Sequence, residues 1–261
     1  MPLEHRFSLA GKKTMVIGAE TPAGGAIARA YAEAGADVAL CALTADDAVL
    51  KARAVKRDIE AMGRTATEYV MDVTLGKNVQ VTTRQIAKEL GGLDAVASAP
   101  DLFLAKPIEK ISDSELQRVM QMNFTSQFFV VRTAVEEFRR AKAPGRIVLV
   151  TSVLHERGMM NVSAYSAAAG AVASLIRSAG HELSHENITV NGIGLGWMDW
   201  MDDRLTPGDE NADRARRFPM LRRMGTAEDL GGLAVLLSAE ESAPYITGQV
   251  LAVDGGLTQH Q

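Results

Sequence analysis

The chain has 261 residues, of which 47% are hydrophobic, and its 28 basic and 32 acidic side chains give a formal net charge of -4. This length can bury one large α/β core, and the charge gives no electrostatic reason to expect a nucleic acid or a membrane as partner. With a single cysteine, Cys41, the chain can build neither a disulfide framework nor a cysteine-based metal site. We therefore expect a small-molecule role without a metal.

Apolar runs that predict buried strands alternate with helical patterns along the whole chain. The strands are expected at 13–18, 37–42, 65–71, 94–98, 146–150, 188–193 and 249–253. The helices are expected at 23–34, 46–62, 77–90, 112–142, from about 162 onward, and at 227–237. This order predicts a doubly wound, Rossmann-like α/β fold: seven parallel strands, helices on both faces, and a ligand crevice at the carboxyl ends of the strands.

No linker, repeat or low-complexity tract divides the sequence, so residues 1–261 are expected to form one domain. The opening segment MPLEHRFSLAGKK has no apolar run of signal-peptide length. No stretch approaches the roughly 18 apolar residues of a membrane span. A cytoplasmic protein is the expectation.

A glycine-bearing turn, GAETPAG, follows the first strand, with Gly18 and Gly24 at its ends and Pro22 between them. A strand, such a turn and a helix open a dinucleotide-binding βαβ unit, in which backbone amides at the helix N-terminus contact the pyrophosphate. Thr21 and Ala23 are further candidates for that contact. Proline removes one amide donor, yet it is also an acceptable first residue of a helix, and both interpretations stay open.

The segment 146–173 predicts a buried strand followed by an alanine-rich helix. Ser152 at the end of the strand and Tyr165 one turn into the helix are expected to face the same cleft. With Asn123 in MNFTSQFF, the runs GGLD and ITVNGIGLG, and the ending YITGQVLAVDGG, this Ser-x12-Tyr spacing resembles the short-chain dehydrogenase/reductase family over nearly the whole chain.

The resemblance implies oxidation of a secondary alcohol, or reduction of a carbonyl, with NAD or NADP as cofactor. Tyr165 would exchange a proton with the substrate oxygen, Ser152 would orient that oxygen, and Asn123 would support a relaying water. Asn123 is also of a type that bridges a helix kink. The resemblance further implies a homodimer or homotetramer that pairs through the helix before residue 146 and the helix that carries Tyr165.

The sequence departs from the family pattern at positions that face the cofactor. Ala169 stands where the family has a lysine that holds the ribose and lowers the pKa of the tyrosine. Because ionising an unperturbed phenol at pH 7 costs about 4 kcal/mol, Tyr165 is expected to be a poor base. His155 as a base or Arg157 as a positive charge could take the place of the lysine, although a solvated charged loop is the plainer interpretation.

The remaining candidate positions carry little charge. Leu43 at the end of the second strand selects neither NAD nor NADP, and Ser98 to Asp101 replaces the family's Asn-Asn-Ala-Gly. Asp72 would face the adenine or cap a helix. The candidate cofactor contacts are Gly18, Thr21, Ala23, Gly24, Leu43, Asp72, Val73, Ser98, Gly196 and Met198.

An insertion at 197–224 begins apolar and then turns charged, which is typical of the family's substrate lid. Its first residues, which include Trp197, Met198, Trp200 and Met201, would form an apolar wall or a subunit interface. The candidate substrate contacts are His155, Arg157, Trp197 and Trp200.

Three functions are compatible with this sequence. The nearly complete scaffold favours an oxidoreductase that acts on a small apolar carbonyl compound or secondary alcohol. Pro22, Leu43, Ala169 and Trp200 depart from the pattern where the cofactor would lie. These departures favour a cofactor-independent enzyme, of the lyase or dehalogenase kind, that uses Ser152 and Tyr165, or else a catalytically silent binding subunit.

Overall fold

The computed structural model describes residues 3–204 and 217–259. All seven predicted strands are present and form one parallel sheet in the order β3-β2-β1-β4-β5-β6-β7, which confirms the predicted fold class. The strands are β1 (Lys13–Ile17), β2 (Asp37–Ala42), β3 (Ala66–Val70), β4 (Ala95–Ser98), β5 (Gly145–Ser152), β6 (Ile188–Leu195) and β7 (Val250–Val253). The strand order reverses between β1 and β4, which places the crevice at their carboxyl ends.

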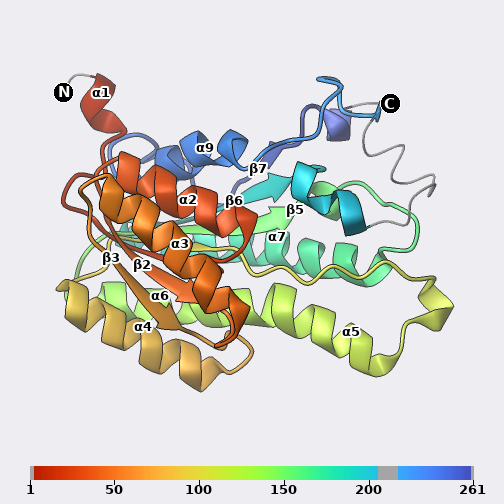
Figure 1. The fold of residues 1–261 in the computed structure, drawn as a ribbon, viewed down its shortest axis with the longest axis horizontal. Helices are drawn as coiled ribbons and strands as arrows, with labels where there is room; N and C mark the ends of the chain where they lie inside the picture. The colour runs from red at the N-terminus through yellow and green to blue at the C-terminus, as the bar shows by residue number, and fades with distance from the viewer. Residues whose placement is uncertain (1–2, 205–216, 260–261) are drawn as a thin grey trace.

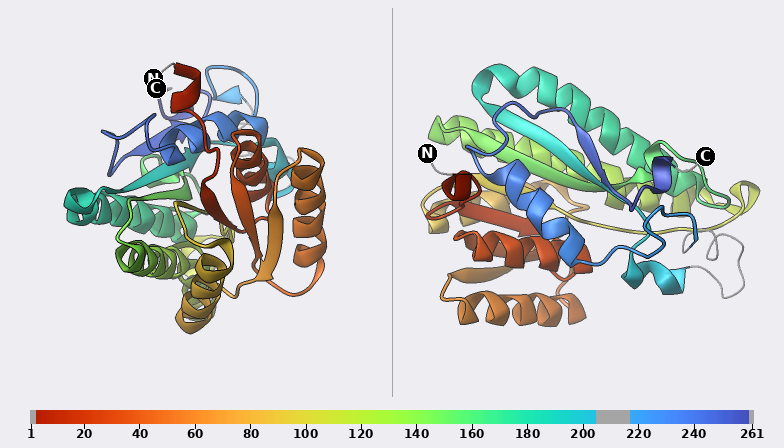
Figure 2. Two further views of the ribbon diagram at one scale, coloured as in Figure 1. Left: turned by 90° about the vertical axis from the view of Figure 1, so that its left-hand side faces the viewer. Right: turned by 90° about the horizontal axis from the view of Figure 1, so that it is seen from above.

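Helices cover both faces of this sheet, as Figures 1 and 2 show. One face carries α2 (Pro22–Glu33), α3 (Asp47–Ala61) and α9 (Glu228–Ser238), and the other carries α4 (Gly76–Leu90), α6 (Ser126–Ala141) and α7 (Ser163–Leu183). The shorter pieces are α1 (Leu3–Arg6), η1 (Ile108–Lys110), α5 (Asp113–Met120), η2 (Gln121–Thr125), η3 (Val153–His155), η4 (Ser184–Glu186), η5 (Asp199–Arg204) and η6 (Leu257–Gln259). No helix in residues 3–204 and 217–259 is both long and apolar enough to cross a membrane.

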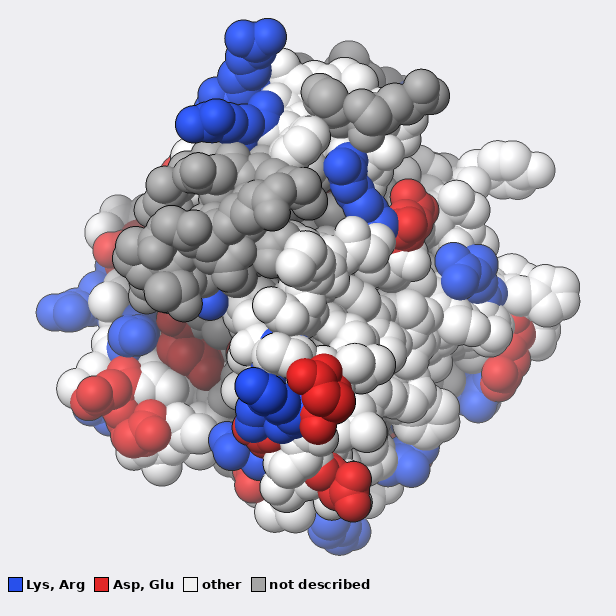
Figure 3. Space-filling view, turned by 90° about the vertical axis from the view of Figure 1, so that its right-hand side faces the viewer, with Lys and Arg blue, Asp and Glu red and all other residues white. Residues whose placement is uncertain are grey.

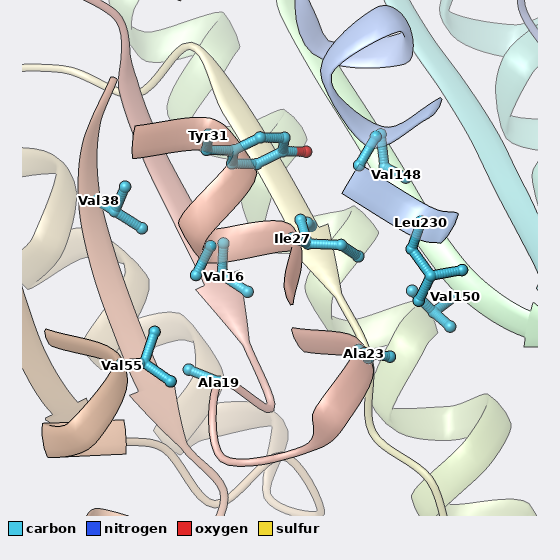
Figure 4. Close-up of a cluster of buried hydrophobic side chains, with 14 of the residues drawn as sticks. Val16, Ala19, Ala23, Ile27, Tyr31, Val38, Val55, Val148, Val150 and Leu230 are labelled. Carbon is cyan, nitrogen blue, oxygen red and sulfur yellow. The ribbon is translucent and has the colours of Figure 1, made fainter. Parts of the chain in front are cut away.

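The core forms because neighbouring residues of a strand point to opposite faces of the sheet. Val16 packs toward α2 with Ile27, whereas Met15 and Ile17 pack toward the helices of the other face. Figure 4 shows the first of these clusters, in which Val16, Ile27 and Leu230 come from β1, α2 and α9. Both faces of β1 are therefore anchored, and the turn that follows β1 is held in place.

Two boundaries differ from the expectation in ways that shape the crevice. The strand expected at 146–150 continues to Ser152, because β5 stays paired with β6 as far as Ser152 opposite Leu195. The single helix expected at 112–142 is split into α5 and α6 by the π-helical turn η2, which carries Asn123. The sequence SDSE at residues 112–115, which is typical of a helix start, caps α5: the Ser112 hydroxyl accepts from the backbone amide of Glu115, and the Glu115 carboxylate accepts from that of Ser112.

Candidate active site

Two adjoining cavities lie at the carboxyl end of β5. The apolar cavity, of about 460 Å³, has walls from Phe103, Met159, Trp197, Met201, Phe218 and Leu257. The glycine-turn cavity, of about 240 Å³, has walls from Thr21, Pro22, Ala23, Ala99 and Pro100. Ser152, Tyr165, Leu195 and Arg204 line both cavities. A molecule in one cavity therefore meets a molecule in the other at these side chains.

Ser152 is positioned by the end of β5 and the start of η3. Its hydroxyl accepts a hydrogen bond from the amide of Leu154 at 3.2 Å and lies 3.5 Å from the carbonyl oxygen of Leu195. Ser152 is buried, yet it lines both cavities. The hydroxyl is thus fixed by the backbone, with capacity left for a ligand oxygen.

Tyr165 is held by charged neighbours that the sequence reasoning did not connect to it. Its hydroxyl donates to the carboxylate oxygen Oδ1 of Asp101 at 2.9 Å. The other carboxylate oxygen of Asp101 pairs with Arg204 of η5. The Arg204 guanidinium lies 5.4 Å above the ring of Phe103, and that ring meets the ring of Tyr165 edge-on at 5.2 Å.

The pKa of Tyr165 lies well above its ordinary value. Burial is the largest cause, the negative charge of Asp101 adds to it, and the positive charge of Arg204 opposes it. Ala169 is buried on the wall of the glycine-turn cavity, where its methyl group brings no charge to the phenol. As the missing lysine predicts, the phenol stays protonated at neutral pH and is a hydrogen-bond donor rather than a base.

Asn123 clamps the segment that follows β4. Its Oδ1 accepts from the amide of Leu102 and its Nδ2 donates to the carbonyl of Leu102, both at 2.9 Å. Asn123 also lines the glycine-turn cavity. The side chain therefore holds the chain that carries Asp101 instead of bridging the π-helical turn in which it lies.

The turn after β1 has the tight geometry that its glycines predict. Gly18 has a φ of +76°, and a Cβ atom there would lie 2.8 Å from the carbonyl oxygen of Ala99. A Cβ atom on Gly24 would lie 2.1 Å from the carbonyl oxygen of Gly18. Thr21 caps α2 by accepting from the Gly24 amide at 3.0 Å, and Pro22 is the first helical residue. Pro22 is thus an ordinary helix start that also forms part of the cavity wall.

Glu20 is a site residue that sequence reasoning missed. Its Oε1 accepts the amide of Leu43 at 3.0 Å, so a carboxylate stands at the end of β2 where Leu43 itself brings none. Its Oε2 is buried with no hydrogen-bond partner among the described residues, and burial raises the pKa of Glu20. Glu20 lines the glycine-turn cavity, as does Lys51 of α3. The signal in the sequence that could have identified Glu20 was an acidic residue two positions after Gly18.

The glycine-turn cavity has the residues that a dinucleotide needs. The turn and the start of α2 supply a closely packed backbone, and the unpartnered Oε2 of Glu20 is an acceptor that a ribose hydroxyl can satisfy. The far end of the cavity reaches Ser152 and Tyr165. These residues fit a nicotinamide dinucleotide.

Three residues predicted to contact the substrate or the cofactor lie away from the cavity expected for them. His155 turns away from Tyr165: its Nδ1 lies 2.8 Å from the carbonyl oxygen of Ser152, and its ring lines a separate surface pocket. Met198 is fully buried and its backbone pairs with Gly225, so it reaches the wall of neither cavity. Trp200 lines the glycine-turn cavity rather than the apolar one. The paths of the chain after β5 and after β6, which periodicity does not encode, place these side chains.

Among the other candidates, Thr21 and Ala23 line the glycine-turn cavity, whereas Gly196, Arg157 and Trp197 line the apolar cavity. Asp72 instead accepts from the amide and hydroxyl of Thr74, at 2.9 and 2.6 Å, in the turn before α4. Val73 and Ser98 are buried and line neither cavity. Leu43 is partly buried and packs against the core cluster that contains Val73.

Figure 3 shows the end of the molecule where the segments after β5 and β6 lie. On the coloured part of this face, basic and acidic side chains stand in small groups with uncharged surface between them. Such a mixed surface lacks the broad positive field that draws a polyanion.

Comparison with known proteins gives the family. A family model described as enoyl-(acyl carrier protein) reductase matches residues 18–258. The chain is 30% identical over 256 residues to 2-dehydro-3-deoxy-D-gluconate 5-dehydrogenase of Bacillus subtilis, with 97% of each chain covered. It is 30% identical over 253 residues to gluconate 5-dehydrogenase of Gluconobacter oxydans, with 97% of this chain and 96% of the relative covered.

Comparison with solved structures gives the same result as comparison of sequences. A short-chain type dehydrogenase/reductase from Mycobacterium marinum superposes with a TM-score of 0.88 at 29% identity, over 99% of both chains. A blue fluorescent protein from a metagenomic library, in complex with NADPH, superposes with a TM-score of 0.85 at 29% identity, over 96% of this chain and 99% of the other. The chain belongs to the short-chain dehydrogenase/reductase family of oxidoreductases.

Proposed function

We propose that the protein is an NAD(P)-dependent oxidoreductase that interconverts a secondary alcohol and a ketone. The observation that carries the proposal is the placement of Ser152 and Tyr165 on the wall shared by the two cavities. A dinucleotide held at the glycine turn and a substrate in the apolar cavity then meet at these two hydroxyl groups. The relative solved with NADPH supports the choice of cofactor class.

The cofactor would be held by Thr21 and Ala23 beside the pyrophosphate and by Glu20 beside the adenosine ribose. A carboxylate at this position accepts the two ribose hydroxyls of NAD and repels the extra phosphate of NADP. Glu20 is partly buried, whereas Lys51 on the same wall is exposed, so the carboxylate is less screened by water. We therefore propose NAD as the preferred cofactor.

The substrate would have an apolar body and an oxygen acceptor. The walls of the apolar cavity are dominated by aromatic, methionine and leucine side chains, unlike a site built for a polyol. Trp197 also lines it, and its Nε1 is a buried donor that finds no partner within residues 3–204 and 217–259. The lid proposed at 197–224 supplies Trp197 and Met201 to this wall, and its residues 205–216 lie outside the described residues.

In such a mechanism the nicotinamide, when bound, accepts or returns a hydride. The protein's own contribution is to hold the substrate oxygen between the Ser152 and Tyr165 hydroxyls and to keep water out of the apolar cavity. Because the phenol of Tyr165 is protonated, it would donate to a ketone oxygen in the direction of reduction once its hydrogen bond turns from Asp101 to the substrate. Alcohol oxidation requires a group that takes a proton from Tyr165.

A thermal-shift titration with NAD, NADH, NADP and NADPH tests the proposal. A ligand at 100 times its Kd stabilises the folded state by about 2.7 kcal/mol, which is well resolved as a rise in Tm. We expect the largest rise with NAD or NADH. The absence of any shift with all four dinucleotides at millimolar concentration would remove the oxidoreductase proposal.

A second candidate is a cofactor-independent enzyme that holds a substrate oxygen with Ser152 and Tyr165. The presence of Pro22 and Trp200 on the wall of the glycine-turn cavity favours it, because both add bulk where a dinucleotide would lie. This candidate predicts that apolar ketones raise Tm while dinucleotides do not. The same titration therefore separates the two functions.

A further inference from the structure

The tyrosine that lacks its partner lysine contacts an acid. Tyr165 donates its hydroxyl proton to Asp101 at 2.9 Å, and Asp101 belongs to the segment after β4, where the family pattern has neither an acid nor a proline. Arg204 holds the second oxygen of the same carboxylate. The oxygen that faces Tyr165 is thereby kept in place as a hydrogen-bond acceptor.

Building on the proposed function, we propose that Asp101 accepts the proton of Tyr165 during alcohol oxidation and that Arg204 positions Asp101 for this transfer. The substrate O–H bond breaks and its proton moves to Oη of Tyr165, while the existing proton of Tyr165 moves to Oδ1 of Asp101. The C–H bond of the alcohol breaks as the C=O bond forms, and its electron pair leaves as hydride to the nicotinamide dinucleotide. The alcohol is oxidised, the dinucleotide is reduced, and Asp101 carries one proton.

Burial explains why a double transfer suits this site. Tyr165 is 9% exposed, so a full negative charge on its oxygen would be poorly solvated. When Tyr165 gains one proton as it loses another, that charge never forms. The side chain of Asp101 is 22% exposed, so it can release the proton to water after the turnover.

Two charged side chains in the described part of the chain face the phenol, and of these two the carboxylate of Asp101 is the group that accepts a proton. Asp101 faces it from the segment after β4, Arg204 faces it from η5, and α7 itself presents Ala169. Arg157 stands on the wall of the apolar cavity and is engaged with the carbonyl oxygen of Leu257 at 2.5 Å. Among the described residues that surround Tyr165, Asp101 is the acid in hydrogen-bond contact with it.

The substitution Asp101→Asn tests the proposal, because asparagine keeps the shape and a hydrogen bond but accepts no proton. We expect kcat for alcohol oxidation to fall by about 10²- to 10⁴-fold, the usual value of general acid-base catalysis. The Tm shift with NAD should stay unchanged. Asp101→Glu should restore part of kcat, and Asp58→Asn, which breaks a surface pair with Arg29, should leave kcat as it is.

A titration without cofactor or substrate provides the second readout. The ultraviolet absorbance of tyrosinate is followed with pH, and the trace of Tyr165→Phe is subtracted to isolate Tyr165. In Asp101→Asn the Tyr165 pKa should fall, because a neighbouring negative charge is lost while Arg204 remains.

Unchanged kcat together with an unchanged Tyr165 pKa in Asp101→Asn would overturn the role of Asp101. A protein that binds no dinucleotide would instead overturn the proposed function, and the titration would still report on the contact of Asp101 with Tyr165.

Discussion

Tyr165 owes its chemistry to its neighbours. In the family pattern an ammonium group four residues later stabilises the phenolate, whereas here Ala169 fills that position and Asp101 faces the phenol. Ala169 is uncharged and Asp101 is negative, and burial together with Asp101 outweighs the opposing charge of Arg204, so the proton stays on the phenol. The same tyrosine on the same helix is therefore a donor rather than a base.

A lysine at position 169 should lower the pKa of Tyr165. Ala169→Lys places a positive charge at the wall of the glycine-turn cavity, and we expect the pKa of Tyr165 to fall and kcat for oxidation to rise at least about tenfold, equivalent to about 1.4 kcal/mol. Ala169→Met controls for the added bulk. Equal rates in the lysine and methionine variants would show that charge at this position has no part in turnover.

Glu20 should set the choice between the two dinucleotides. Glu20→Arg replaces a carboxylate with a cation that can pair with the extra phosphate, and we expect the ratio of kcat/KM for NAD over NADP to fall by about 100-fold or more. Lys51→Ala, on the same wall, should change the ratio far less. A ratio that stays the same in Glu20→Arg would place the adenosine ribose elsewhere.

The site could be predicted in part. Ser152 and Tyr165 follow from their spacing on a strand and a helix, which local periodicity encodes. Asp101, Arg204 and Glu20 lie in segments without periodicity, and tertiary packing brings them to the cavities. The charges of those segments were visible in the sequence, but their partners were not.

At the scale of elements, η2 decides the position of the segment after β4. A π-helical turn shifts the apolar pattern of a helix by only one residue, which periodicity over 112–142 does not resolve, so the sequence predicts one uninterrupted helix. The turn brings Asn123 to both backbone groups of Leu102. Asp101 is the neighbouring residue, so the clamp also fixes the acid that contacts Tyr165.

The start of α9 depends on one carboxylate. Asp229 pairs with Arg223 at 2.7 Å and accepts from the amide of Thr226 at 2.8 Å, and these contacts lower the pKa of Asp229 to about 2. Its stabilisation is therefore complete above the ordinary value of 3.8 and is lost as pH falls toward about 2.

We expect Asp229→Asn to lower the free energy of unfolding at pH 7 by about 1 kcal/mol, as for the loss of a helix cap. The difference from the natural protein should shrink below about pH 4, where the Asp229 carboxyl of the unfolded chain begins to be protonated. Urea unfolding at several pH values measures this. A difference that is constant with pH would assign the effect to packing instead.

For the whole molecule, alternation of strands and helices was enough to predict the sheet and its crevice. The strand order follows from parallel pairing and right-handed crossovers, and the crevice lies at the reversal between β1 and β4. The walls of the two cavities could not be predicted in the same way. They come from the segments after β4, β5 and β6, whose course depends on what they pack against.

We propose that the protein is a dimer or tetramer that pairs through α6 and α7. Phe128 on α6 is 44% exposed, so it is an apolar side chain that pairing through this helix would cover. Phe128→Asp should shift the mass measured by light scattering toward the monomer. Leu50→Asp, at an exposed position of α3, should leave the mass unchanged. A natural protein that is monomeric at micromolar concentration would contradict this proposal.

The most direct measurement is the single-turnover formation of reduced nicotinamide from NAD and an apolar secondary alcohol, followed by its absorbance. The natural protein should form reduced nicotinamide, and Asp101→Asn should bind NAD equally well but form it at least about 100-fold more slowly. Tight binding of NAD with no reduced product for any apolar alcohol, or equal rates in the two proteins, would contradict the account.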